Sequence, residues 1–262
     1  MFNRVCWEVD MNPEVTEEKP SALVIGVGAY HTLGAACCRR FAAQGFHVIA
    51  AARLIDNAQN AADAIHKDGG SAEAVCLDSC DEKAVASLFT YAMTHGNGRA
   101  PVSAVVFHAG NSARIPFLEL TAARFERMWK SVCYAGFLIG REAMQHMVTL
   151  GRGTVIFTGA TGSLRGKDGY AHYAAAKGGL RMVVQSMARE FGPLGIHVSN
   201  VILDGAIEGQ RLSEAEREHF ANAGPASILQ VDAVAETIWH LHTQHPSAWT
   251  HELDLRPSVE TF

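Results

Sequence analysis

The feature that most constrains this chain is a regular alternation of short apolar runs with longer segments of helical period, from Ser21 onward. The apolar runs are ALVIGV, FHVIAAAR, SAEAVCLD, VSAVVFHAG, GTVIFTGA and IHVSNVIL, and HELDLRP near the end is typical of a last short strand. Strands that alternate with helices form a parallel sheet covered on both faces. The sequence therefore predicts an α/β fold, a doubly wound Rossmann-type parallel sheet of about seven strands.

The length and composition fit one domain, because 262 residues of which 48% are hydrophobic supply one full core. Residues 1–20 carry no sustained period and predict a flexible N-terminal arm, so the single domain is expected to span residues 21–262. A long helix is expected from Thr121 to Leu150, and another from Asp232 to His242. The charged stretch 209–224 is a candidate substrate lid, although a plain solvated helix fits it equally well.

Charge and composition exclude several kinds of partner. A formal net charge of -5 without a cluster of Lys or Arg argues against nucleic acid and against an anionic membrane surface. The chain has no run of about 18 apolar residues and no signal peptide, so a cytoplasmic protein with a small-molecule substrate is expected. The six cysteines show neither a CxxC pair nor His at metal-ligand spacing, which predicts buried thiols in a reducing compartment and no metal site.

A glycine-rich segment, GVGAYHTLG, follows the first apolar run and opens a helix. Gly26 and Gly28 can turn tightly there and bring backbone N–H groups to a pyrophosphate. The second strand ends in AAAR, which puts Ala52 where a carboxylate would bind an unphosphorylated ribose and puts Arg53 directly after it. A guanidinium binds a 2′-phosphate through two charge-assisted hydrogen bonds, so NADP(H) is expected in preference to NAD(H). His31 is a further candidate donor.

With these features in order, the chain resembles the short-chain dehydrogenase/reductase family from Ala22 to Leu255. LDSC matches the family's adenine contact, FHAG its Asn-Asn-Ala-Gly turn, YAAAK its Tyr-x-x-x-Lys pair, and DGAIEG lies at its Pro-Gly turn. The resemblance implies that Tyr173 and Lys177 are the catalytic pair. It also implies a cofactor site made of Gly26, Gly28, His31, Thr32, Leu33, Arg53, Asp78, Ser79, Ala109, Gly110, Tyr173, Lys177, Gly205 and Ile207.

Tyr173 and Lys177 lie four residues apart and therefore share one face of a helix. An unperturbed phenol has a pKa of about 10 and is a poor proton shuttle at neutral pH. The expectation is that the Lys177 ammonium, with an oxidised nicotinamide, lowers the pKa of Tyr173 by about 3. The resemblance implies that Lys177 also holds the nicotinamide ribose.

Two positions depart from the family pattern. Ala160 stands thirteen residues before Tyr173, where the family has its catalytic serine, and Val132 stands where it has an active-site asparagine. Without a substitute, the missing serine is expected to cost about two to three orders of magnitude in rate. A hydroxyl from a shifted position could come from one of three residues: Thr158, Thr161 and Ser163.

The leading functional hypothesis is an NADPH-dependent carbonyl reductase or alcohol dehydrogenase in which Tyr173 exchanges the proton. A second is an enoyl-thioester reductase of the divergent type, because Gly26 and Thr32 have that branch's spacing and Tyr170 with Lys177 fits its Tyr-x6-Lys pattern. A third is a non-catalytic protein that senses NADPH or acts as a scaffold. The apolar stretches VCYAGFLIG and GGLRMVVQSMA are consistent with the homodimer or homotetramer that the family resemblance implies.

Overall fold

The computed structural model describes residues 18–29, 31–96, 98–110, 113–209 and 214–260. Within them, seven strands form one sheet in the order β3-β2-β1-β4-β5-β6-β7, and every neighbouring pair is parallel. The strands are β1 (Lys19–Ile25), β2 (His47–Ala52), β3 (Ser71–Cys76), β4 (Arg99–Phe107), β5 (Gly153–Ala160), β6 (Ile196–Leu203) and β7 (Glu252–Leu255). The predicted doubly wound sheet is confirmed.

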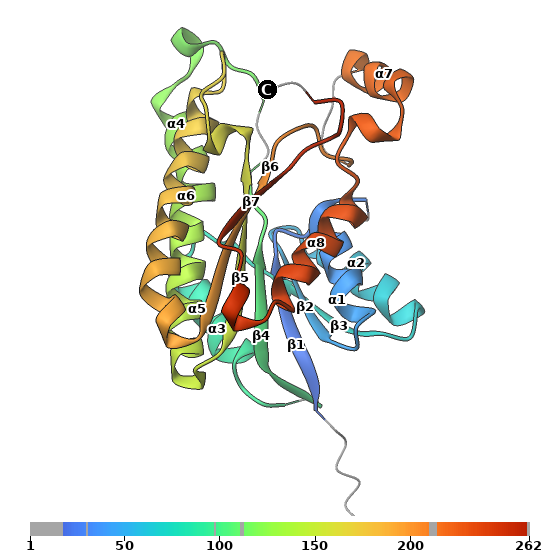
Figure 1. Cartoon of the computed structure of the whole chain (residues 1–262), viewed down its shortest axis with the longest axis vertical. Coiled ribbons are helices and arrows are strands. Elements are labelled where there is room, and N and C mark those ends of the chain that lie inside the picture. Colours follow the sequence, from blue (N-terminus) through green and yellow to red (C-terminus); the bar gives the residue numbers. More distant parts are fainter. Residues whose placement is uncertain (1–17, 30, 97, 111–112, 210–213, 261–262) are drawn as a thin grey trace, which may run out of the picture.

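Helices cover both faces of this sheet (Figure 1). The α-helices are α1 (Leu33–Ala42), α2 (Ile55–Lys67), α3 (Glu82–Ala92), α4 (Ala122–Trp129), α5 (Ala135–Leu150), α6 (Ala171–Phe191), α7 (Glu214–Ala223) and α8 (Val231–His242). Short 3-10 turns occupy η1 (Phe117–Glu119), η3 (Thr161–Ser163), η4 (Gly192–Leu194), η5 (Pro225–Ser227) and η6 (Pro246–Ala248). One core packs α1, α2 and α8 against the sheet, and the other packs α3, α5 and α6 against the opposite face.

The topology determines where a ligand can bind. The strand order reverses between β1 and β4, and ligands of doubly wound sheets bind outside the carboxyl ends of the strands at such a reversal. β2 and β6 are buried at every residue, and β1 and β4 are buried over the residues before their carboxyl ends. The candidate site is therefore confined to the loops that follow the strands.

The structure differs from the sequence expectations at the start of the first strand and in the long helix. β1 begins at Lys19, whose backbone N–H donates to the carbonyl of Gly98 at 3.0 Å, so the end of the predicted arm belongs to the sheet. Residues 1–17 lie outside the described residues. The expected helix from Thr121 to Leu150 contains a π-helical turn, η2 (Lys130–Tyr134), between α4 and α5. Such turns widen a helix locally and occur often at functional sites.

The candidate lid and the cysteines match the sequence expectations only in part. α7 occupies most of the described part of the stretch 209–224 and lies at the carboxyl edge of the sheet (Figure 1), whereas residues 210–213 are outside the described residues.

Cys37, Cys38 and Cys133 are buried as predicted, but Cys76 is exposed because it ends the edge strand β3. No helix in the described part of the chain is long and apolar enough to cross a membrane.

Candidate active site

The turn from β1 to α1 begins at a position that only glycine fits. Gly26 has φ +97°, and a Cβ there would lie 1.7 Å from the carbonyl oxygen of His108. The backbone N–H of His108 donates to the carbonyl of Ile25 at 2.9 Å, so the exits of β1 and β4 are in direct backbone contact. The turn therefore lies at the reversal of strand order, where the sequence predicted a pyrophosphate site.

The N-terminus of α1 follows this turn. A Cβ on Gly28 would lie 2.8 Å from Thr32 Cγ2, so the turn also packs closely against Thr32. The hydroxyl of Thr32 donates to the carbonyl of Ala29 at 2.7 Å and does not cap the helix, and Leu33, the first helical residue, is buried. Among the residues that the structure describes, no side chain is therefore seen to accept from the first N–H groups of α1, as an anion site requires.

The predicted adenosine contacts lie at the ends of β2 and β3. Ala52 is buried and Arg53 is exposed, and among the described residues no carboxylate forms an ion pair with the Arg53 guanidinium. One carboxylate oxygen of Asp78 accepts from the backbone N–H of Cys80 at 3.0 Å, which folds the loop around the half-buried Ser79. These strands are neighbours in the sheet, so the structure brings Arg53 and Asp78 to the same edge.

The exit of β4 meets the face of α6 that carries Tyr173 and Lys177. Gly110, next to the half-buried Ala109, has φ +98°, and a Cβ there would lie 2.8 Å from Val132 Cγ2. The same Cβ would lie 3.4 Å from Tyr173 Cε2 and 3.5 Å from Lys177 Cε. The β4 exit, the π-helical turn and the Tyr–Lys pair thus converge on one point at the carboxyl edge of the sheet.

Burial governs the electrostatics of the Tyr–Lys pair. The Lys177 ammonium donates to the carbonyl of Thr158 at 2.7 Å, and its nitrogen lies 5.9 Å from the centroid of the Tyr173 ring. Burial raises the pKa of Tyr173 to about 12 and lowers the pKa of Lys177 to about 7. In the protein alone, the loss of hydration thus opposes the charged form of both groups, whereas the expected lowering of the Tyr173 pKa involves Lys177 together with an oxidised nicotinamide.

The three candidate hydroxyls have different partners. Thr158 Oγ1 lies 2.9 Å from His108 Nδ1, and the hydroxyl of Thr161 donates to a carboxylate oxygen of Asp204 at 2.6 Å. The hydroxyl of Ser163 accepts from the backbone N–H of Ala160 at 3.0 Å and keeps its own proton for a further bond. Of the three, Ser163 is the hydroxyl least committed to other protein groups.

The loop after β6 packs against the glycine turn. A Cβ on Gly205 would lie 2.6 Å from Pro257 Cδ, so this loop also contacts the segment that follows β7. Ile207 pairs with Leu229 in an isolated parallel bridge. A Cβ on Gly209 would lie 2.0 Å from the carbonyl oxygen of His31. The structure therefore brings the predicted residues of the β6 exit next to those of the β1 exit.

The region with these features matches a known family over most of its length. Residues 22–219 match the sequence signature of the short chain dehydrogenase family. The chain belongs to this family. The matched region begins in β1, contains both the glycine turn and the Tyr–Lys pair, and ends in α7.

Individual relatives agree with this assignment. The uncharacterized oxidoreductase YuxG of Bacillus subtilis is 31% identical over 203 residues, which are 76% of this chain but only 29% of that longer protein. Elsinochrome reductase 1 of Elsinoe fawcettii is 30% identical over 220 residues, which cover 82% of this chain and 79% of the reductase. The crystal structure of a short-chain dehydrogenase from Rhodopseudomonas palustris is 37% identical and has a TM-score of 0.76, with 91% of this chain and 98% of that chain covered. Both sequence relatives carry oxidoreductase names.

The sequence reasoning missed two polar residues that directly follow buried strands. His108 follows β4 and contacts Thr158. Asp204 follows β6, is 1% exposed, and accepts from Arg165 Nη2 at 3.2 and 3.3 Å while Arg256 Nη2 lies 3.5 Å away. A polar residue at the carboxyl end of an otherwise apolar strand was the available signal, because such residues reach the ligand edge of the sheet.

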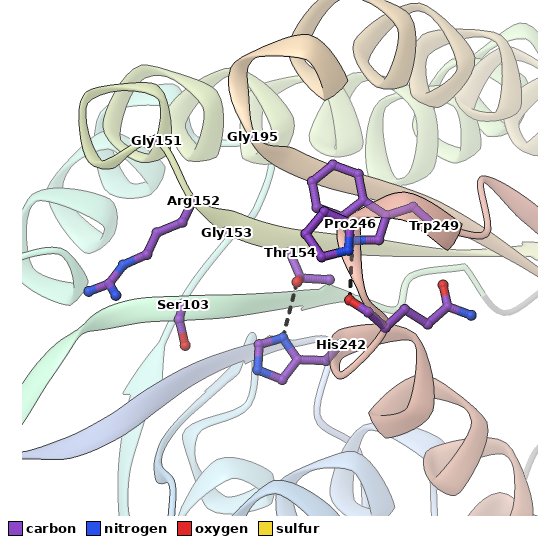
Figure 2. Close-up of a pocket in the computed structure, with 10 residues that line it drawn as sticks. Ser103, Gly151, Arg152, Gly153, Thr154, Gly195, His242, Pro246 and Trp249 are labelled. Atoms are coloured by element: carbon purple, nitrogen blue, oxygen red, sulfur yellow. Dashed lines mark hydrogen bonds between the residues drawn. The ribbon is translucent and has the colours of Figure 1, made fainter.

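A separate cavity of about 320 Å³ lies at the opposite, amino edge of the sheet (Figure 2). Its lining includes Ser103, Thr154, His242 and Trp249, and His242 Nδ1 lies 3.1 Å from Thr154 Oγ1. Figure 2 shows the Arg152 side chain extending away from Trp249. Doubly wound folds bind their cofactors at the carboxyl ends of the strands, whereas this cavity lies at the amino ends. It is therefore distinct from the candidate active site.

Proposed function

We propose that this member of the family is an NADP(H)-dependent oxidoreductase that transfers hydride between nicotinamide and a carbonyl or alcohol substrate. The observation that carries the proposal is the convergence of Gly110, Tyr173 and Lys177 at the carboxyl edge of the sheet, beside the turn that begins at Gly26. Nicotinamide supplies the hydride in such chemistry, and the protein supplies binding, orientation and the proton.

The residues present fit a phosphorylated dinucleotide. Gly26 places no side chain in the turn, and Thr32 does not cap α1, so among the described residues no side chain is seen to accept from the first N–H groups of α1, where the pyrophosphate would bind. Arg53 would bind the 2′-phosphate, and Asp78 and Ser79 would line the adenine. The remaining cofactor contacts that we propose are Gly28, His31, Thr32, Leu33, Ala109, Gly110, Tyr173, Lys177, Gly205 and Ile207.

Tyr173 is suited to act as a proton donor in reduction. Because burial raises its pKa to about 12, the phenol is fully protonated at neutral pH. An alkoxide that forms as hydride adds to a carbonyl is a strong enough base to take this proton. The Lys177 ammonium, held by the carbonyl of Thr158, would stabilise the phenolate left behind.

Ala160 and Val132 are proposed to replace the family's catalytic serine and asparagine. Ala160 has no hydroxyl to polarise a carbonyl, and Val132, which is fully buried, has no polar side-chain atom. We propose that Ser163 is the nearest substitute, since its hydroxyl is bonded to the backbone of Ala160. Without that substitute the rate would fall by about two to three orders of magnitude.

The proposal is tested by following NADPH oxidation with a panel of aldehydes, ketones and quinones. Stoichiometric oxidation of NADPH with formation of the alcohol, or of the hydroquinone from a quinone, supports it. Reduction of enoyl thioesters alone would favour the divergent enoyl-reductase alternative, with Tyr170 as a required residue. Tight NADPH binding without turnover of any substrate would favour the sensor or scaffold alternative.

The pH dependence of reduction follows from Lys177. Its pKa is lowered to about 7, so the ammonium is present below pH 7 and is lost as the pH rises through this value. The value of kcat/KM for reduction is therefore expected to fall about tenfold per pH unit on the alkaline side. The guanidinium of Lys177→Arg does not titrate in this range, so that variant should lose the alkaline limb. A wild-type rate that rises between pH 7 and 9 would contradict this assignment.

Cofactor preference is expected to depend on Arg53. Replacing it by alanine removes two charge-assisted hydrogen bonds to a 2′-phosphate, which should raise the Kd for NADPH about 10- to 100-fold and change the Kd for NADH less than about threefold. Titration calorimetry measures both. Arg152→Ala, an exposed arginine at the other edge of the sheet, is the matched control. Equal losses for the two nucleotides in Arg53→Ala would argue against a role in 2′-phosphate recognition.

The proposed oligomer is a homodimer or homotetramer built on α5 and α6. Phe137 on α5 is 42% exposed and Met182 on α6 is 52% exposed, so both helices present large apolar side chains outward. Apolar exposure of this kind is typical of subunit contacts. Sedimentation analysis of the purified protein gives the assembly state directly.

A further inference from the structure

His108 lies between the glycine turn and the Tyr–Lys pair, at a position to which the proposed mechanism gives no role. Its backbone is fixed on both sides, because its N–H donates to the carbonyl of Ile25 at 2.9 Å and its carbonyl oxygen packs over Gly26. Its side chain points toward β5, where Nδ1 lies 2.9 Å from Thr158 Oγ1. The backbone carbonyl of that same threonine accepts from the Lys177 ammonium at 2.7 Å. A chain of two hydrogen bonds thus connects His108 to Lys177 through one residue.

The Thr158 hydroxyl lies within hydrogen-bonding distance of two groups, the His108 imidazole and the carbonyl of Phe107. The Thr158 hydroxyl has one proton, and the carbonyl oxygen of Phe107 lies 3.5 Å from its oxygen as an acceptor. The 2.9 Å contact with His108 forms in both tautomers of the imidazole: Nδ1–H donates to Thr158 Oγ1, or the Thr158 hydroxyl donates to an unprotonated Nδ1. The histidine then holds the threonine side chain from one side while Lys177 binds its carbonyl from the other.

The charges around this arrangement favour a neutral histidine. Burial, with a smaller contribution from the Lys177 ammonium, lowers the pKa of His108 to about 3. Lys177 faces Tyr173 on its own helix and His108 on the β4 exit, and within the described residues no carboxylate offsets the burial that lowers its pKa. Lys177 is therefore the one cation of this described cluster, and its charged form depends on neutral acceptors such as the carbonyl of Thr158.

We propose that His108 is a positioning residue that fixes Thr158, so that the Thr158 carbonyl binds the Lys177 ammonium in a site where Val132 offers no polar atom. Its importance for catalysis rests on the proposed function. Its effect on the protonation of Lys177 does not, because that effect is a property of the protein alone.

The experiment is an NMR titration of the protein with lysines labelled at Cε, in which the Lys177 signal is assigned by its loss in Lys177→Arg. Two variants, His108→Phe and Thr158→Val, each remove one partner of the hydrogen bond between His108 and Thr158. In each, the pKa of Lys177 is expected to fall by about one pH unit, because a less well-held acceptor stabilises the ammonium less. His108→Asn keeps both a side-chain donor and a side-chain acceptor, so its Lys177 pKa should stay within a few tenths of a pH unit of the wild-type value.

The effects of His108→Phe and Thr158→Val on the Lys177 pKa should not add. If His108 acts through Thr158, the double variant has the same Lys177 pKa as either single variant, whereas independent effects would sum. An unchanged Lys177 pKa in a folded His108→Phe protein, or in Thr158→Val should the phenylalanine variant fail to fold, overturns the proposal. Absence of carbonyl reduction by the wild-type protein would count against the proposed function, yet the titration would still decide the role of His108.

Discussion

Replacing Tyr173 by phenylalanine is expected to lower kcat/KM for carbonyl reduction by about 10²- to 10⁴-fold, the usual contribution of a positioned proton donor. The change removes one oxygen and leaves the ring, which packs near Gly110 and Gly162, so fold and nucleotide affinity should be retained. Steady-state kinetics with a substrate identified by the NADPH oxidation screen measure the loss, and NADPH titration verifies that the site is intact.

Tyr170→Phe is the matched control for this substitution. Tyr170 lies three residues before Tyr173 and precedes the first turn of α6, so it has the same chemistry without the proposed position on the helix. Carbonyl reduction by Tyr170→Phe should stay within about twofold of wild type. The reverse pattern, with Tyr170 required and Tyr173 dispensable, would replace the proposed mechanism by the enoyl-reductase alternative.

Gly26→Ala is expected to have the largest effect on stability and on nucleotide binding together. Gly26 has φ +97°, and the added Cβ would lie 1.7 Å from the carbonyl oxygen of His108, which is backbone on the neighbouring strand exit. Neither side of this contact can move without displacing β1 or β4. A loss of about 3–5 kcal/mol in the free energy of unfolding is expected, with NADPH binding lost or greatly weakened. Chemical denaturation and calorimetry measure the two effects.

Gly45→Ala separates the steric cost from the conformational one. Gly45 has φ +82°, close to that of Gly26, but nothing lies within 4 Å of a Cβ built on it. Its substitution should cost only the left-handed backbone conformation, about 1–2 kcal/mol, and should leave nucleotide affinity unchanged. If Gly26→Ala proved no more damaging than Gly45→Ala, the close approach of the β1 and β4 exits would not be a requirement of the site.

The fold could be predicted from the sequence because its signals are local and repeated. IHVSNVIL is buried at every residue as β6, and the alternation of such runs with amphipathic helices permits only a parallel sheet covered on both faces. The glycine turn and the Tyr–Lys pair could be placed for the same reason, since each follows a recognisable strand. The contact of Gly26 with His108 and that of Gly110 with Tyr173 and Lys177 agree with a site assembled from strand exits.

What could not be predicted depends on contacts between residues distant in the chain. The pairing of His108 with Thr158 joins residues 50 positions apart, and the ion pairs of Asp204 join three separate loops. The π-helical turn that carries Val132 has no distinct sequence period. The burial that raises the pKa of Tyr173 in the protein alone is likewise a tertiary property.

The measurement that tests the central claim most directly is thermal unfolding of the wild-type protein with NADPH and with NADH, each at saturating concentration. A nucleotide at a hundred times its Kd adds about 2.7 kcal/mol to the free energy of unfolding, or roughly 5–10 °C in Tm for a chain of this length. The account predicts this shift with NADPH and a clearly smaller one with NADH at the same concentration. No shift with either nucleotide would contradict it, because the turn at Gly26 and the Tyr–Lys pair would then not form a nicotinamide site.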